Sequence, residues 1–148
     1  MAAFQVAGNK GTASVRSIVN ARAAASGMAR GFLYEYEFGN IDTPADNAFD
    51  HQILRSSTAP TGAANTPNPN DPAEAAAVGF VAMDTVTVDP TFGAIMFRCP
   101  VNQRASFRWV CTPWRPIIWP ATANNGLTGA IAAAATNNFS GTFGLDCQ

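Results

Sequence analysis

Short runs in which apolar and polar side chains alternate, separated by turn-forming residues, most limit how this chain can fold. In the clearest run, residues 32–38, four aromatic side chains point one way while Glu35 and Glu37 point the other. A period of two is typical of a strand with one buried face. Weaker runs lie at residues 49–56, 79–88, 94–99, 106–111, 127–135 and 139–145. We therefore predict a mainly β protein, an antiparallel β-sandwich or a jelly-roll-like barrel.

The first 31 residues lack this pattern. They are rich in Ala, Ser, Gly and Asn and hold few large apolar side chains. Val15, Ile18 and Val19 have helical spacing, but the apolar stripe that they form is thin. We predict that residues 1–31 form an extended N-terminal arm that becomes ordered on a partner, or an arm that contains one short helix. Residues 32–148 then form a single β domain.

One short helix is predicted inside a long loop. Residues 57–72 contain four prolines, which is typical of a surface loop. The loop closes with Asp71-Pro72-Ala73-Glu74, which offers an N-cap, a proline at the first helical position and an acid two positions later. These signals predict a helix over Pro72–Val78, ended by Gly79.

Charge is sparse and unevenly spread along the chain. Charged residues make up 13% of its 148 residues and the net charge is −1, so a nucleic acid or a membrane is not an expected partner. Eight of the nine basic residues are arginines, which are enriched at protein interfaces, although codon bias has the same effect. Residues 1–34 hold four cations and no acid, whereas residues 35–89 hold nine acids and one arginine. This segregation favours ion pairing, within one subunit or head to tail between copies.

No set of residues predicts catalysis. The single histidine, His51, alternates with Phe49 and Ile53, which indicates a packed histidine more than a general base. Three cysteines lack metal-binding spacing, and no glycine-rich stretch has the order of a phosphate-binding loop. Two of the cysteines lie on strands that could form a hairpin, but in a register that does not pair them, so we expect free thiols. We predict no enzyme activity, no cofactor and no metal.

Arginine and aromatic residues gather between residues 104 and 119. Such a set can stack on bases or on a sugar ring, or it can form a protein–protein hot spot. A third interpretation keeps the aromatic residues in the core and pairs the arginines with the acidic middle segment. For an interface, together with the cations of the arm, the candidates are Lys10, Arg16, Arg22, Arg30, Arg104, Arg108, Trp114, Arg115 and Trp119.

Several strings in the chain resemble a known class of proteins. They are NQRASFRW at residues 102–109 and PATANNGL at residues 120–127, preceded by TPADNA at residues 43–48 and the proline-rich loop at 66–72. In this order they resemble small virion-associated proteins of tailed bacteriophages, over about residues 30–128. The C-terminal TFGLDCQ departs from that pattern, because it holds less acid and carries Cys147.

The resemblance implies a function as well as a setting. It implies a capsid decoration (cement) protein, a homotrimer that binds the major capsid protein on the outer surface of an icosahedral virion. Such a protein is made in the host cytoplasm and has no catalytic residue. Two alternatives stay open: a jelly-roll coat or tail component, and a glycan-binding host-attachment module that uses Trp114 and Trp119.

Overall fold

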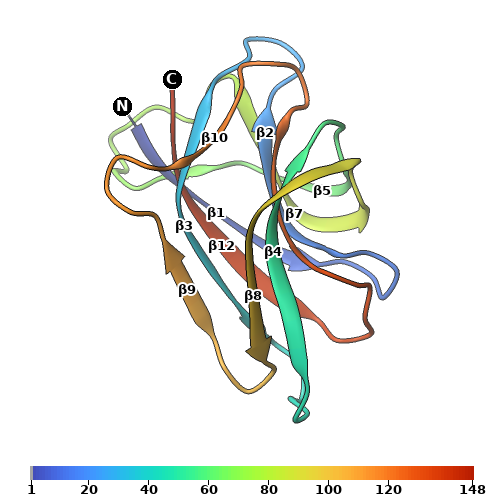
Figure 1. Cartoon of the computed structure of the whole chain (residues 1–148). Coiled ribbons are helices and arrows are strands. Elements are labelled where there is room, and N and C mark those ends of the chain that lie inside the picture. The colour runs from blue at the N-terminus through green and yellow to red at the C-terminus, as the bar shows by residue number, and fades with distance from the viewer. Residues whose placement is uncertain (1) are drawn as a thin grey trace.

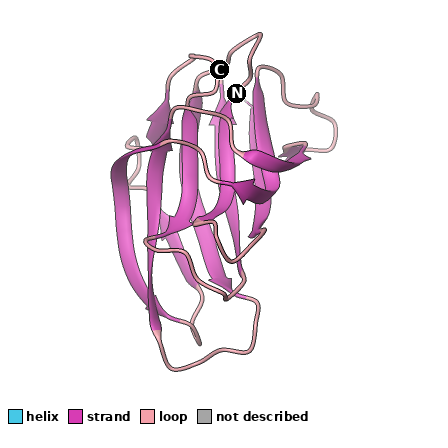
Figure 2. Cartoon of the chain, turned by 90° about the vertical axis from the view of Figure 1, so that its right-hand side faces the viewer, coloured by secondary structure: helices cyan, strands magenta, loops and turns pink. Residues whose placement is uncertain are grey.

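The computed structural model describes residues 2–148, and these residues form twelve strands and no helix (Figures 1 and 2). The strands are β1 (Ala2–Lys10), β2 (Ser17–Ala23), β3 (Gly31–Asn40), β4 (Ala48–Ser56), β5 (Thr61–Asn65), β6 (Asn68–Pro69), β7 (Phe80–Val88), β8 (Phe92–Asn102), β9 (Phe107–Val110), β10 (Ile117–Trp119), β11 (Gly126–Ile131) and β12 (Phe139–Cys147). The prediction of a mainly β protein is confirmed.

All twelve strands belong to one strongly curved sheet that nearly closes into a barrel. The strand order is β10-β3-β12-β1-β7-β2-β11-β4-β8, with β9 beside β3, β6 beside β1 and β5 beside β7. Every pair is antiparallel except β1 and β7, which meet in parallel over only two residue pairs. This short junction divides the sheet into two halves that face each other. The pairing of β1 with β12 also brings the two chain ends together (Figure 1).

The core lies between these two halves. The half around β3 and β12 contributes Leu33, Tyr36 and Phe143, and the half around β11 and β4 contributes Leu127 and Ile53. All five side chains are fully buried. The apolar area that they remove from water is the main favourable term in the stability of such a fold.

The predicted N-terminal arm is wrong. β1 pairs with β12 from Ala2 to Asn9, and β2 lies between β7 and β11 inside the sheet. Most of β2 is buried on both faces, so its sequence shows no alternation of apolar and polar residues. Small residues in this segment allow close approach of the strands: a Cβ at Gly8 would lie 2.7 Å from the carbonyl oxygen of Ile18. The small side chains therefore reflect tight packing rather than an unfolded arm.

The predicted helix over Pro72–Val78 is also wrong. The Asp71 side chain accepts a hydrogen bond from the backbone of Ala73, and its carbonyl accepts one from Glu74, so one turn begins as expected. The turn does not continue, since the segment that follows is mostly exposed and packs only Ala77 against the core, too little to hold an isolated short helix. The preceding proline-rich loop is more ordered than expected, because it contains β5 and β6.

The first predicted strand exists, but its alternation is interrupted. Between β3 and β12 the register shifts, so that Gly144 lies opposite Glu35 while Leu145 lies opposite Leu33. Tyr34 is the extra residue of this β-bulge. As a result Leu33 points into the core, and Tyr34 is only half-buried.

Asp89 joins the end of β7 to the start of β2. Its carboxylate accepts hydrogen bonds from the backbone N–H groups of Arg16 and Ser17 and from the Ser17 hydroxyl, at 2.6–3.1 Å. Replacing Asp89 by alanine is expected to lower the free energy of unfolding by about 2 kcal/mol, because donors in a part-buried site lose their acceptor. Asp71→Ala, which removes a carboxylate from an exposed turn, is the control for urea denaturation. Equal losses in the two variants would contradict this role of Asp89.

Candidate interaction surface

The fold divides the nine residues predicted for an interface into two sets. The side chains that are buried or half-buried are those of Lys10, Arg16, Arg22 and Trp119. The exposed side chains are those of Arg30, Arg104, Arg108, Trp114 and Arg115. The exposed set can meet a partner without any rearrangement of the fold.

Lys10 ends β1 and is buried. Its ammonium group donates hydrogen bonds to the carbonyl oxygens of Thr12, at 2.8 Å, and Ala135. Burial lowers the pKa of Lys10, against the charges of Asp42 and Asp89, which raise it. The side chain therefore fastens two loops and is directed into the protein.

Arg16 takes part in a similar internal contact. Its Nε donates to the carbonyl oxygen of Ile131 at 3.0 Å, and an Nη donates to Gln52 at 3.3 Å. The guanidinium lies 4.7 Å from the centre of the Phe92 ring, a cation–π distance. These contacts join the segment before β2 to β11, β4 and β8.

Arg22 lies on β2 beside a buried polar group. It donates to Asn20 Oδ1 at 3.0 Å, and Asn20 in turn donates to Thr128 Oγ1 at 2.8 Å. Burial lowers the pKa of Arg22. Arg22 therefore makes an internal hydrogen bond, as Lys10 and Arg16 do. Of the four cations of the predicted arm, only Arg30 is exposed.

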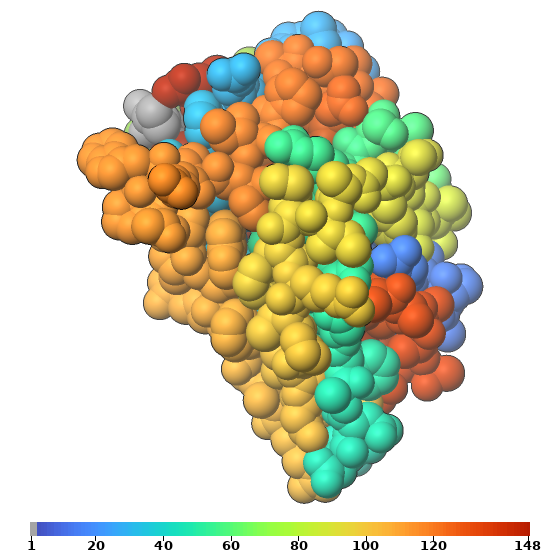
Figure 3. All heavy atoms as spheres, in the orientation of Figure 1, coloured from blue at the N-terminus to red at the C-terminus, as the bar shows by residue number. Residues whose placement is uncertain are grey.

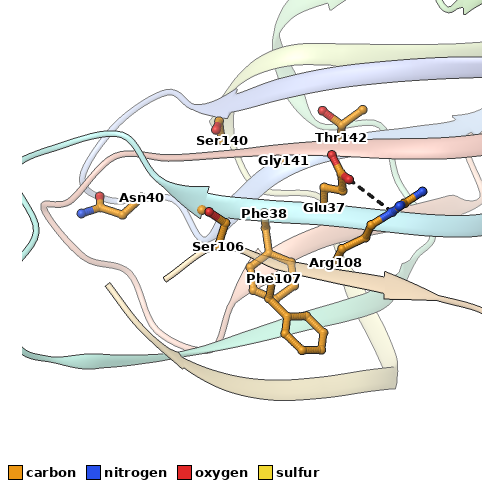
Figure 4. Close-up of a pocket in the computed structure, with 10 residues that line it drawn as sticks. Glu37, Phe38, Asn40, Ser106, Phe107, Arg108, Ser140, Gly141 and Thr142 are labelled. Atoms are coloured by element: carbon orange, nitrogen blue, oxygen red, sulfur yellow. Dashed lines mark ion pairs between the residues drawn. The ribbon is translucent and has the colours of Figure 1, made fainter. Parts of the chain in front are cut away.

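Arg108 forms ion pairs on the outer face of the sheet. Its Nε contacts carboxylate oxygens of Glu35 and Glu37, the latter at 3.3 Å. The hydrogen bond to Glu35 is the main reason that the pKa of Arg108 is raised. Figure 4 shows Glu37 and Arg108 turned towards each other, with Phe38 and Phe107 on the opposite side of their strands. An open groove of about 410 Å³ lies over this region and is lined by residues of β3, β9 and β12.

The segregated charges pair within the subunit in this region. Besides the Arg108 pairs, Arg98 on β8 contacts the Asp50 carboxylate on β4 at 2.6 Å. In both cases an arginine from residues 90–148 meets acids from the acidic segment, residues 35–89. Of the two arrangements that the sequence allowed, pairing inside one subunit is therefore present at Arg98 and Arg108. Arg104 and Arg115 form no ion pair with any residue of the described range 2–148.

The two tryptophans named for an interface have opposite environments. Trp119 on β10 is fully buried against Phe80, with ring centres 6.1 Å apart. Trp114 lies in the turn between β9 and β10 and is 96% exposed. This turn, at residues 111–116, protrudes from the left side of the molecule in Figure 3.

An exposed apolar edge adjoins this turn. Exposed Ile95 and Met96 belong to β8, and exposed Phe107 and Val110 belong to β9. β8 ends the strand order, and β9 pairs only with β3, so within residues 2–148 each strand has one edge without a partner strand. Unpaired edges with apolar side chains are typical of surfaces that another chain covers.

His51 is a packed residue, as expected. Its ring stacks on Phe38 with centres 4.0 Å apart and meets the edge of Phe139 at 5.3 Å. Burial lowers the pKa of His51 to about 4, and the nearby Asp50 charge opposes this shift. The three cysteines are free, and β8 and β9 form no hairpin with each other. In the part of the chain that the structure describes, no group of three His, Cys, Asp or Glu side chains could hold a metal ion.

The sequence alone did not identify Ile95, Met96 and Val110 as surface residues. Ile95 and Met96 are consecutive apolar residues in the predicted strand AIMFRC, a pattern typical of a strand buried on both faces. Their exposure follows from the position of β8 at the end of the sheet, which depends on tertiary pairing. The only sequence signal for such an edge is Pro100 within the strand, because proline is confined to edges and bulges.

Comparisons with known proteins found no match to a family model, to a curated protein or to a solved structure. Among the described residues, no helix is long and apolar enough to cross a membrane.

Proposed function

We propose that the chain has the jelly-roll topology. Eight of its strands pair as one long folded hairpin: β1 with β12, β2 with β11, β3 with β9 and β4 with β8. The hairpin then curls so that β12 also pairs with β3 and β11 with β4. This pairing gives two four-stranded layers, β1-β12-β3-β9 and β2-β11-β4-β8, the arrangement of two Greek keys. Strands β5, β6, β7 and β10 lie in the connections.

We infer from this strand pairing that the protein is a structural subunit of a virus particle. Jelly rolls serve as viral capsid domains and as lectins, so the topology narrows the function without fixing it. The phage resemblance of residues 30–128 favours the viral role. The exposed apolar edge supports a subunit that works by contact with other chains.

As the resemblance implies, the subunit decorates the outer surface of a capsid as a homotrimer and binds the major capsid protein. The contacts with the capsid shell cannot come from an N-terminal arm, because β1 and β2 belong to the sheet. The folded surface must make these contacts instead. The exposed members of the predicted interface supply the groups for it: Arg104, Arg115 and Trp114 lie on the segments that follow β8 and β9.

A coat subunit is the second candidate, and the shape of the molecule favours it. Figure 3 shows a body that tapers from a broad upper end to a narrow lower end. Tapered units packed side by side form a curved layer, which a closed shell requires. A glycan-binding role loses one of its two stacking platforms, because the Trp119 ring is buried.

The mass of the full chain in solution tests the proposal. We expect a trimer that co-sediments with empty shells of the parent virus, because decoration needs both self-contact and shell contact. A coat subunit would instead assemble alone into closed shells, visible by electron microscopy. A chain that stays monomeric at high concentration and does not bind shells would contradict both roles.

A further inference from the structure

Trp114 is presented to solvent at a cost to the fold. Its side chain is 96% exposed and its φ is 65°, in the left-handed region that residues with a side chain seldom adopt. Glycine would fit this backbone without strain, and a polar residue would suit the exposure. Backbone strain of this kind is retained where the surrounding structure imposes it, and it gathers at sites of function.

The turn that carries Trp114 is held in place. The backbone N–H of Arg115 donates to Thr112 at 3.0 Å, and that of Cys111 donates to Tyr34 on β3 at 2.8 Å. Pro113 and Pro116 bracket the turn and restrict its backbone further. A large side chain on a rigid turn loses little conformational entropy on binding, which suits it as an anchor.

A matching hollow lies elsewhere on the same chain. Small residues of β8 and of the segment after β10 line a mostly apolar cavity of about 260 Å³, among them Gly93, Ala94 and Pro120. Arg55 forms another wall, where its Nη1 donates to the carbonyl oxygen of Ile118 at 2.7 Å. The hollow is open to solvent on one side, with Ser56, Ser57 and Asn125 in its lining, and its volume exceeds the about 150 Å³ of an enclosed cavity that takes up benzene, so an indole has room to enter. A guanidinium wall suits the electron-rich face of an indole.

Both features continue into exposed apolar surface. The cavity residues Gly93 and Ala94 are followed on β8 by Ile95 and Met96, and Val110 on β9 precedes the turn of Trp114. A chain seated over the cavity would therefore also cover part of the apolar edge. This extra area strengthens a contact that one side chain alone could not maintain.

We propose that Trp114 of one copy inserts into the cavity of a second copy. This proposal rests on the proposed function, since it identifies the contact between copies that an assembling subunit needs. The knob, which is the Trp114 side chain, and the hollow, which is the cavity, are different patches of one chain, so the contact is heterologous. When it is repeated from copy to copy, such a contact closes a ring such as a trimer or extends a layer.

Two single substitutions test the contact from its two sides. Trp114→Ala removes the knob, and Ala94→Phe fills the hollow from an exposed wall position. Each is expected to raise the dissociation constant of self-association by about tenfold or more, as for a hot-spot residue. Two controls, Ala94→Ser, which keeps the hollow open, and Ile41→Ser, which removes an exposed apolar side chain elsewhere, should leave it within about twofold. Thermal unfolding verifies that all four variants fold.

Mixing the two variants gives the decisive result. Trp114→Ala keeps an intact hollow and Ala94→Phe keeps an intact knob, so together they should form dimers and nothing larger, measured by native mass spectrometry. Failure of the mixture to dimerise, or wild-type oligomers that persist in Trp114→Ala, would overturn this contact and leave the proposed function standing. A wild-type chain that neither self-associates nor binds shells would overturn both.

Discussion

Replacing Trp119 by alanine is expected to lower the free energy of unfolding by about 4 kcal/mol, the usual cost of deleting a buried aromatic side chain. The indole is fully buried and packs on Phe80 and across Gly31. A Cβ at Gly31 would lie only 1.7 Å from the ring, so the chain has no side chain there that could move into the space. Urea denaturation followed by circular dichroism measures the loss.

Trp114→Gly is the matched control, because it deletes the same type of side chain from the same proline-rich segment, residues 113–120. The indole has almost no packing to lose, and glycine relieves the left-handed backbone. We expect the free energy of unfolding to change by less than about 1 kcal/mol, towards greater stability. Similar losses in the two variants would show that the turn of Trp114 supports the fold rather than a partner.

These two tryptophans show where sequence analysis fails. Both lie next to a proline in the segment PWRPIIWP, and both were predicted for the same interface. What separates them is pairing: Trp119 lies on β10 opposite Gly31, whose missing side chain leaves room for the ring, about ninety residues earlier in the chain. Local composition carries no information about such a contact.

A strand could be predicted from the sequence where one of its faces is exposed to solvent. Residues 32–38 alternate because one side of β3 is more exposed than the other, and this strand was predicted. β2 was missed because it is buried on both faces, so that its pattern has no period of two. Its polar members are satisfied inside the protein, as Asn20 is by Thr128, and their burial depends on partners distant in sequence.

The candidate surface was predicted in part for the same reason. Arg104, Arg115 and Trp114 lie in loops, where a charged or bulky side chain is exposed whatever the strand order. The positions of Lys10 and Arg16 depend on carbonyl oxygens of Ala135 and Ile131, which only the fold brings to them. Charge alone therefore could not distinguish an internal cation from one at an interface.

His51 should make the protein unstable in acid. The folded chain holds the imidazole neutral, since burial lowers its pKa from 6.5 to about 4, whereas the unfolded chain protonates it near pH 6.5. The contribution of neutral His51 to the free energy of unfolding is complete above pH 6.5 and is lost as the pH falls towards 4. In this range the unfolded chain binds a proton at His51 that the folded chain does not bind. The free energy of unfolding should fall by about 3 kcal/mol between pH 7 and pH 4 from this group.

His51→Leu separates this contribution from that of the carboxylates, which titrate in the same range. Leucine keeps an apolar contact with Phe38 and Phe139 and removes the titration. Urea denaturation of both proteins at pH 7 and pH 4 gives the comparison: the wild-type chain should lose about 3 kcal/mol more than the variant. Equal losses would mean that the imidazole takes up its proton inside the folded protein, where Asp50 on the same strand would be the group to stabilise it.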